Sequence, residues 1–108
     1  MPEMSHLREE IRLLHAGICQ AMADPKRILI MYTLHEQPHN VTALAEELEL
    51  PQPTVSRHLR VLHQNALVTK ERDGAAVVYS LADDRIIKAL DIIRSVMTDA
   101  LAQQSELF

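Results

Sequence analysis

The sequence contains few of the residues that build redox, metal or nucleotide sites. Its 108 residues include one cysteine, two glycines, no tryptophan and only three aromatic residues. A single cysteine cannot form a disulfide within the chain, and two glycines leave little room for loops that cradle phosphates. No Ser–His–Asp or Cys–His set and no HExxH motif is present, so we do not expect an enzyme.

Long apolar runs are also missing. No stretch approaches the roughly 20 apolar residues of a membrane-spanning helix, and the N-terminus has neither the basic segment nor the apolar run of a signal peptide. We therefore expect a cytoplasmic protein without a membrane partner. A chain of 108 residues without repeats or a linker should form a single domain (1–108) around one core.

Positive charge is scarce overall but locally concentrated. Eleven Lys and Arg residues against fifteen Asp and Glu residues give a net charge of −4, which by itself argues against a nucleic-acid partner. Residues 51–72, however, hold four basic side chains and one acidic side chain, a net charge of +3 that leaves −7 for the rest. Since contact charges act within roughly a Debye length, about 8 Å at physiological salt, a basic face can bind DNA on an acidic protein.

An amphipathic helix is predicted over about residues 52–65. The apolar residues that recur on one side, at spacings of four, three and four, are Val55, Leu59, Leu62 and Ala66. The opposite side carries Arg57 and Arg60, and arginine can pair bidentately with guanine or hold a phosphate. The candidate DNA contacts of this helix are Gln52, Thr54, Ser56, Arg57, His58 and Arg60. Of these, His58 lies closest to the apolar side.

A short helix is predicted just before it, over Val41–Leu48, with Thr42 as its N-cap. Only Glu49–Gln52 separate the two helices, which is typical of a helix-turn-helix unit whose second helix reads DNA. The alternative is an ordinary helical hairpin with a solvated outer face. Elsewhere, Asp24 and Asp83 are predicted to cap the helices that follow them.

Two strands are predicted after the recognition helix. An Asp-Gly pair, the strongest hairpin signal in the chain, separates Leu67–Arg72 from Ala76–Leu81. A hairpin in this place is a wing, over about residues 67–81, with Lys70 and Arg72 near its tip. These two side chains would reach phosphates or a minor groove; the alternative is that they are only solvated charges.

These motifs, in this order, resemble the ArsR/SmtB family of winged-helix transcriptional regulators. The segments that carry the resemblance are Ala21–Ile28, Val55–Leu62, Ala66–Val68, Arg72–Gly74 and Val78–Leu81, and it spans about residues 14–95. The resemblance implies a mainly α fold with a small β-hairpin, in the order α-α-α-α-β-β-α. It also implies a homodimer that binds double-stranded operator DNA, usually represses, and is released by an inducer.

The turn before the recognition helix departs from the family's pattern at two positions. Pro51 stands where a capping serine is usual, and loss of such a cap typically costs about 1 kcal/mol. Glu49 stands where glycine is common, which predicts a left-handed backbone conformation there at some energetic cost.

Apolar stripes at both ends of the chain indicate a second copy as partner. Helices are predicted over about residues 4–20 and 84–104, and the second is apolar over much of its surface. Since so apolar a terminal helix usually needs a second surface to cover it, we predict a dimer through the first and last helices. The alternative is burial within the chain's own core. The predicted interface residues are Leu7, Ile11, Leu14, Leu90, Ile93 and Met97.

The metal-sensing sites known in this family have no counterpart in the sequence. Where many members carry a Cys-x-Cys site, residues 40–46 hold no thiol, and no histidine follows His63 to complete a site on the last helix. Since carboxylates alone favour harder ions than zinc, we predict no metal site, no cofactor and an inducer of unknown kind. A weaker alternative joins His6 and His15 to a carboxylate of the partner's last helix.

Three further positions remain to be placed. Cys19 is interpreted as a small core residue, with a thiol switch by oxidation or by a bridge to the partner's Cys19 as the alternative. His35 and His39 are expected to be solvated loop residues.

The main prediction is a DNA-binding repressor; the alternative is a winged helix that binds protein, whose affinity should depend far less on salt.

Overall fold

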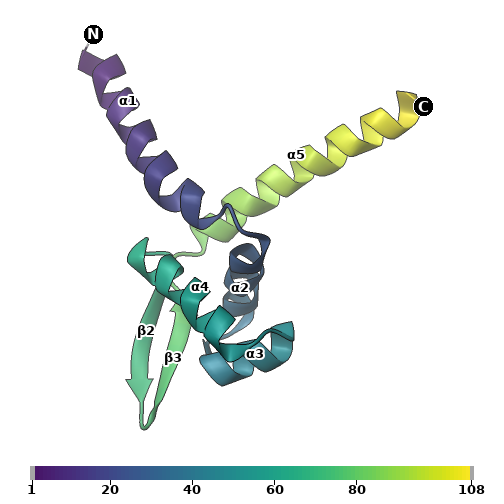
Figure 1. The fold of residues 1–108 in the computed structure, drawn as a ribbon. Coiled ribbons are helices and arrows are strands. Elements are labelled where there is room, and N and C mark those ends of the chain that lie inside the picture. The colour runs from purple at the N-terminus through teal and green to yellow at the C-terminus, as the bar shows by residue number, and fades with distance from the viewer. Residues whose placement is uncertain (1, 108) are drawn as a thin grey trace.

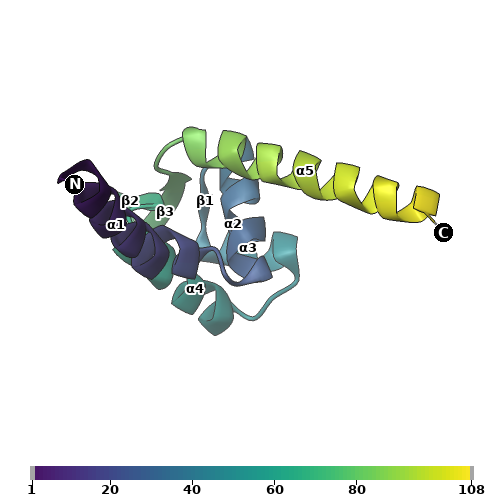
Figure 2. The same ribbon diagram turned by 90° about the horizontal axis from the view of Figure 1, so that it is seen from above.

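The computed structural model describes residues 2–107 and has the predicted mainly α architecture with a β-hairpin. In chain order, its elements are α1 (Pro2–Leu14), the π-helical turn η1 (His15–Cys19), α2 (Pro25–Glu36), β1 (His39–Asn40), α3 (Val41–Leu48), α4 (Gln52–Gln64), β2 (Val68–Asp73), β3 (Ala76–Leu81) and α5 (Arg85–Leu107). Figure 1 and Figure 2 show α1 and α5 projecting as two arms from a body formed by the other elements. The radius of gyration is therefore 16.8 Å, against about 13 Å for a compact chain of this length.

Local hydrogen bonds set the starts of the helices. The carboxylate of Asp24 accepts a hydrogen bond from a backbone N–H of the first turn of α2 at 2.8 Å, and Asp83 does the same for α5 at 2.9 Å, as predicted. The predicted cap of α3, Thr42, is wrong. The helix begins at Val41, as predicted, but its N-cap is Asn40, whose side chain accepts a hydrogen bond from the N–H of Ala43 at 2.8 Å.

The sheet contains the predicted hairpin and one strand that was not predicted. In the hairpin, Asp73 lies opposite Ala76, and the turn between them uses Gly74 at φ 64°, a conformation open to glycine. The two-residue strand β1 pairs with β3, so β3 is the central strand. A strand of two residues is too short to show an alternating pattern in the sequence.

The hydrophobic core lies beneath α4, between α2, α3, the sheet and the first turns of α5. Its largest fully buried side chains are Ile30, Met31, Leu44, Val55, Leu59 and Leu62. The predicted apolar side of the recognition helix is thus confirmed, apart from Ala66. That residue is exposed and left-handed, with φ 59°, because the helix has ended before it.

Helix α1 continues through η1, so the helix predicted over residues 4–20 is present but widens at its end. Within the π-helical turn, Gly17 approaches the end of α4 closely, since a Cβ at this glycine would lie 3.3 Å from the side-chain oxygen of Asn65. Among residues 2–107, no helix combines the length and the apolar character needed to cross a membrane.

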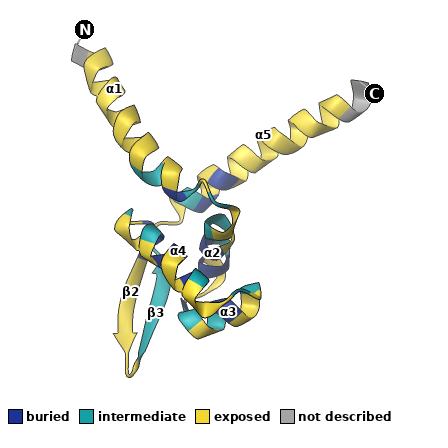
Figure 3. Ribbon diagram, in the orientation of Figure 1, coloured by how far each residue is buried: buried dark blue, intermediate teal, exposed yellow. Residues whose placement is uncertain are grey.

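The two arms leave apolar side chains uncovered, as Figure 3 shows for α1 and most of α5. The large exposed apolar residues include Leu7, Ile11 and Leu14 of α1 and Ile92, Ile93, Val96, Met97 and Leu101 of α5. Leu90 is a correction to the predicted interface. It is only 7% exposed and belongs with Ile87 to the core of its own chain, because the first turns of α5 pack against α2.

Candidate nucleic-acid interface

Helix α4 has one side in the core and one polar side in solvent. Its polar side carries the exposed residues Gln52, Ser56, Arg57 and Arg60, and Thr54 is half-buried beside them. Helix α4 contacts α3 and the first strand of the wing, so the recognition helix and the wing are neighbours (Figure 1). The structure therefore brings five of the six candidate contacts of the recognition helix to an accessible face.

The turn before α4 has the predicted left-handed residue. Glu49 has φ 55° and ψ 45°, and its backbone N–H bonds to carbonyl oxygens of the last turn of α3. Pro51 offers no side-chain cap, and its carbonyl oxygen accepts from the N–H groups of Thr54 and Val55 at 3.1 Å each. Across the turn, the amide of Gln52 donates to the hydroxyl of a threonine in α3 at 3.4 Å. The two helices are thus held together without a capping serine.

His58 does not lie on the outward face, which corrects its prediction as a DNA contact. Its side chain is 5% exposed, because the residue follows Val55 by three positions and shares the buried side with Leu59. Its Nδ1 lies 3.3 Å from a guanidinium nitrogen of Arg27 in α2. Burial lowers the pKa of His58, the charge of Arg27 lowers it further, and Asp24 opposes the shift.

The wing carries the two predicted basic residues in exposed positions. Lys70 lies opposite Tyr79 and Arg72 opposite Val77 on the neighbouring strand. Since side chains two residues apart point to the same face of a strand, Lys70 and Arg72 share one face, while Glu71 between them points to the other. Both side chains are exposed and therefore accessible to phosphates.

The candidate sensing residues are scattered. Cys19 is exposed and does not belong to the core, and the π-helical turn that contains it has no buried residue. His6 pairs with Glu10 at 2.8 Å within α1, and His15 is exposed further along the same helix. Across the described residues 2–107, no three His, Cys, Asp or Glu side chains are grouped as metal ligands would be.

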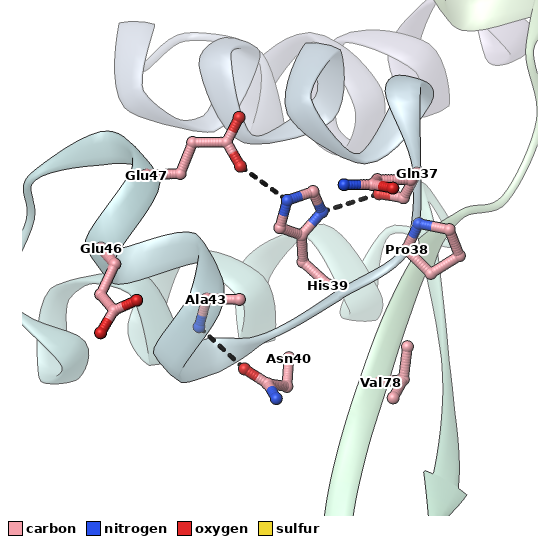
Figure 4. A pocket seen from close by; sticks show the side chains of 8 residues that line it. All are labelled: Gln37, Pro38, His39, Asn40, Ala43, Glu46, Glu47 and Val78. Carbon is pink, nitrogen blue, oxygen red and sulfur yellow. Dashed lines mark hydrogen bonds and ion pairs between the residues drawn. The ribbon is translucent and has the colours of Figure 1, made fainter.

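His39 is buried, so its prediction as a solvated loop residue is wrong. Its Nε2 lies 2.7 Å from a carboxylate oxygen of Glu47, and its Nδ1 lies 2.7 Å from the carbonyl oxygen of Gln37 (Figure 4). These contacts tie β1 to α3 beside an open pocket of about 620 Å³. The pocket is lined by Gln37, Pro38, His39, Asn40, Ala43, Glu46, Glu47 and Val78. His35, by contrast, is exposed as predicted, but it lies in the last turn of α2 and not in a loop, 3.4 Å from Asp84.

The role of Arg27 could not be predicted from the sequence. Its side chain is 16% exposed and lies against the end of the first helical segment and against α4. Only its place in the motif Ala21–Ile28 marked it, and a motif does not reveal tertiary contacts.

Comparisons with known proteins agree with this geometry. The family described as "Bacterial regulatory protein, arsR family" matches residues 24–70, from the start of α2 into the wing. Nodulation protein NolR of Rhizobium meliloti is 35% identical over 99 residues, which cover 92% of this chain and 79% of NolR. The HTH-type transcriptional regulator NmtR of Mycobacterium tuberculosis is 42% identical over 76 residues, which cover 70% of this chain and 63% of NmtR.

A solved structure gives the same result in three dimensions. The crystal structure of NolR from Sinorhizobium fredii superposes with a TM-score of 0.73 at 35% identity, covering 82% of this chain and 89% of that one. A coverage of 82% of the chain extends beyond the 47 positions that the family match spans, residues 24–70.

Proposed function

The chain belongs to the ArsR family of bacterial regulatory proteins, and on this basis we propose that it represses transcription as a homodimer on operator DNA and leaves the DNA when an inducer binds. The observation that carries the proposal is the exposed polar side of α4, with Arg57 and Arg60 next to a wing that presents Lys70 and Arg72. Four cations on one part of an otherwise acidic chain favour a polyanion as partner.

The proposed contacts divide into two kinds. Arg57 and Arg60 lie on the outer side of α4, where arginine side chains of a helix in the major groove can reach base edges, and Gln52, Thr54 and Ser56 near its start bond to bases or phosphates. Lys70 and Arg72 of the wing hold phosphates and add affinity without reading sequence. On this assignment, α4 supplies specificity and the wing supplies sequence-independent affinity.

A second copy of the chain is the proposed partner of the arms. Leu7, Ile11 and Leu14 of α1 are 45–53% exposed, and Ile93 and Met97 of α5 are 60% and 54% exposed. Monomeric proteins rarely leave so many large apolar side chains together in water. A two-fold pairing of the arms would cover them and set two copies of α4 at a fixed separation, as a two-half-site operator requires.

The experiment begins with the purified full chain and a pool of random-sequence duplexes. Selection should enrich one sequence, and the affinity for the enriched duplex should fall steeply with salt, by roughly 0.9 log units per log unit of salt for each phosphate contact. A scrambled duplex of equal length is the control. If selection enriches no sequence, and the chain instead binds a protein with an affinity that hardly depends on salt, the protein-interaction alternative is favoured. Metals, persulfides, oxidants and small molecules are then screened for release of the enriched duplex.

A further inference from the structure

Arg27 lies where three helical segments meet. It belongs to the first turn of α2, and it reaches both the end of the helical segment that follows η1 and the buried side of α4. Most of its side chain is covered, in contrast to Arg57 and Arg60 on the outer side of α4. A largely buried guanidinium group is costly unless its donors are used.

The donors of Arg27 are used, and they connect elements that are far apart in the chain. Its guanidinium group donates to the carbonyl oxygen of Ala21 and, at 3.1 Å, to that of Gln20. Another nitrogen of the same group lies 3.3 Å from Nδ1 of His58 in α4, and the carboxylate of Asp24 lies 3.9 Å away. One side chain therefore joins the last carbonyl groups of the first arm to the recognition helix.

The contact with His58 defines the protonation state of that imidazole. An arginine can only donate, so a hydrogen bond at this contact requires Nδ1 as acceptor in a neutral ring whose proton is on Nε2, the atom that lies 3.9 Å from the carboxylate of Asp24. The lowered pKa of His58, caused first by burial, is consistent with the neutral form. The charged groups that face the ring are Asp24, Lys26, Arg27 and Arg57, and only the first of them favours the charged ring.

We propose that Arg27 is a positioning residue that fixes the rotation of α4 about its axis through His58 and couples it to the end of the first arm. The proposal rests on the DNA-binding function proposed above. Apolar contacts of Val55, Leu59 and Leu62 hold α4 on the body but are non-directional. A hydrogen bond at His58 has a direction, and the next residue, Arg57, is the one whose aim decides which base edge is reached.

The first test is a double-mutant cycle on Arg27→Met and His58→Leu, with the duplex enriched by the wild-type chain and a scrambled duplex as probes. Each single variant should lose on the order of tenfold in affinity for the enriched duplex and less than about threefold for the scrambled one. The double variant should lose no more than either single variant, because both remove the same bond. Losses that multiply, or equal losses on both duplexes, would overturn the proposal. Thermal melts of each variant establish that it is folded.

The second test measures how the preference for the enriched duplex depends on pH, and it begins with the wild-type chain. Protonation of His58 removes the acceptor at Nδ1, and burial lowers the pKa of His58, so the wild-type preference for the enriched duplex should fall only as the pH drops below about 6.5. His58→Asn keeps an acceptor near that position and cannot gain a proton, so its preference should stay constant. The matched control is His63→Asn, at an exposed histidine of the same helix, which should behave like wild type.

A His58→Asn variant that still loses its preference on acidification would overturn the role of His58. Failure of this inference differs from failure of the proposed function. In the first case, the wild-type chain selects a duplex that the variants bind equally well. In the second, the wild-type chain selects none.

Discussion

Helices α4 and α5 carry apolar residues at the same alternating spacing of three and four, but the chain covers them to very different extents. On α4, Val55, Leu59 and Leu62 are all 0% exposed. On α5, Ile93 and Met97 are 60% and 54% exposed. The reason is position, since α4 lies against the body along its length, whereas residues 91–104 of α5 are all exposed (Figure 3). In this stretch, Asp91 and Arg94 reach back to the hydroxyl of Tyr32 in α2, but the apolar side chains stay uncovered.

The face that each helix leaves in water has the opposite chemistry. The outer face of α4 presents Arg57 and Arg60, which are well hydrated and attract an anionic partner. The outer face of α5 presents Ile93 and Met97, whose exposure is unfavourable by roughly 25 cal/mol per Å² of apolar surface. Periodicity alone is therefore a poor guide to function, and the residues on the uncovered side indicate which partner each helix awaits.

The largest effect is expected from a charge on the apolar side of α5. Ile93→Glu would place a carboxylate in the proposed two-fold interface of both subunits, at a cost of several kcal/mol for each. Sedimentation should show a monomer, and the affinity for a two-half-site duplex should fall by at least about a hundredfold with Arg57 and Arg60 untouched. Ser95→Glu, on the opposite side of α5, is the control and should remain dimeric. A dimeric Ile93→Glu with wild-type affinity would place the interface elsewhere.

The next test removes a cation from the outer face of α4. Arg57→Ala should lower the affinity for the enriched duplex by about 1–3 kcal/mol if the side chain reads a base, and relax the preference at that base pair. Competition with duplexes substituted at each position measures both. Unchanged affinity in an intact dimer would remove Arg57 from the proposed interface.

The wing should show a smaller and less selective effect. Replacing Lys70 and Arg72 together by Ala should weaken enriched and scrambled duplexes about equally and reduce the salt slope by up to about two units. Glu71→Gln is the matched control on the same strand, and it should bind both duplexes at least as tightly as wild type. A loss confined to the enriched duplex would mean that the wing reads sequence.

The smallest effect is expected at the turn that positions α4. Glu49 is left-handed, so Glu49→Gly should relieve steric strain of about 1–2 kcal/mol and lose part of that gain to chain entropy, for a net stabilisation below about 1 kcal/mol. The control is Glu46→Gly in the ordinary helical backbone of α3, which should destabilise the protein by about 1 kcal/mol. Urea unfolding measures the free energy of unfolding of both variants, and a Glu49→Gly variant less stable than wild type would contradict the presence of strain at this residue.

Local sequence patterns were sufficient to predict the elements whose apolar side is buried within the same chain. The recognition helix and the wing hairpin were predicted from the stripe at Val55, Leu59 and Leu62 and from the turn at Gly74, since periodicity and turn chemistry act within a few residues. The left-handed conformation of Glu49 was predicted instead from the family's pattern, in which glycine is common at that position.

The errors concern contacts made between elements. His58 lies at the border of the apolar stripe, where the pattern does not separate a buried from an exposed residue, and its contact with Arg27 of another helix cannot be read from the sequence. Leu90 continues the α5 stripe, yet it is the last residue of that stripe that the core of its own chain buries. His39 is buried by a two-residue strand that no sequence pattern reveals.

The uncovered arms make the protein sensitive to its own abundance. Helices α1 and α5 extend beyond the body, and a helix without packing partners is marginally stable in water. If pairing is what protects the arms, then dilution exposes them, and proteases find frayed helices easily. In the dilute regime, doubling the number of chains raises the number of pairs by about fourfold, by mass action. The number of chains competent to occupy a two-half-site operator would then rise more steeply than the amount of protein made.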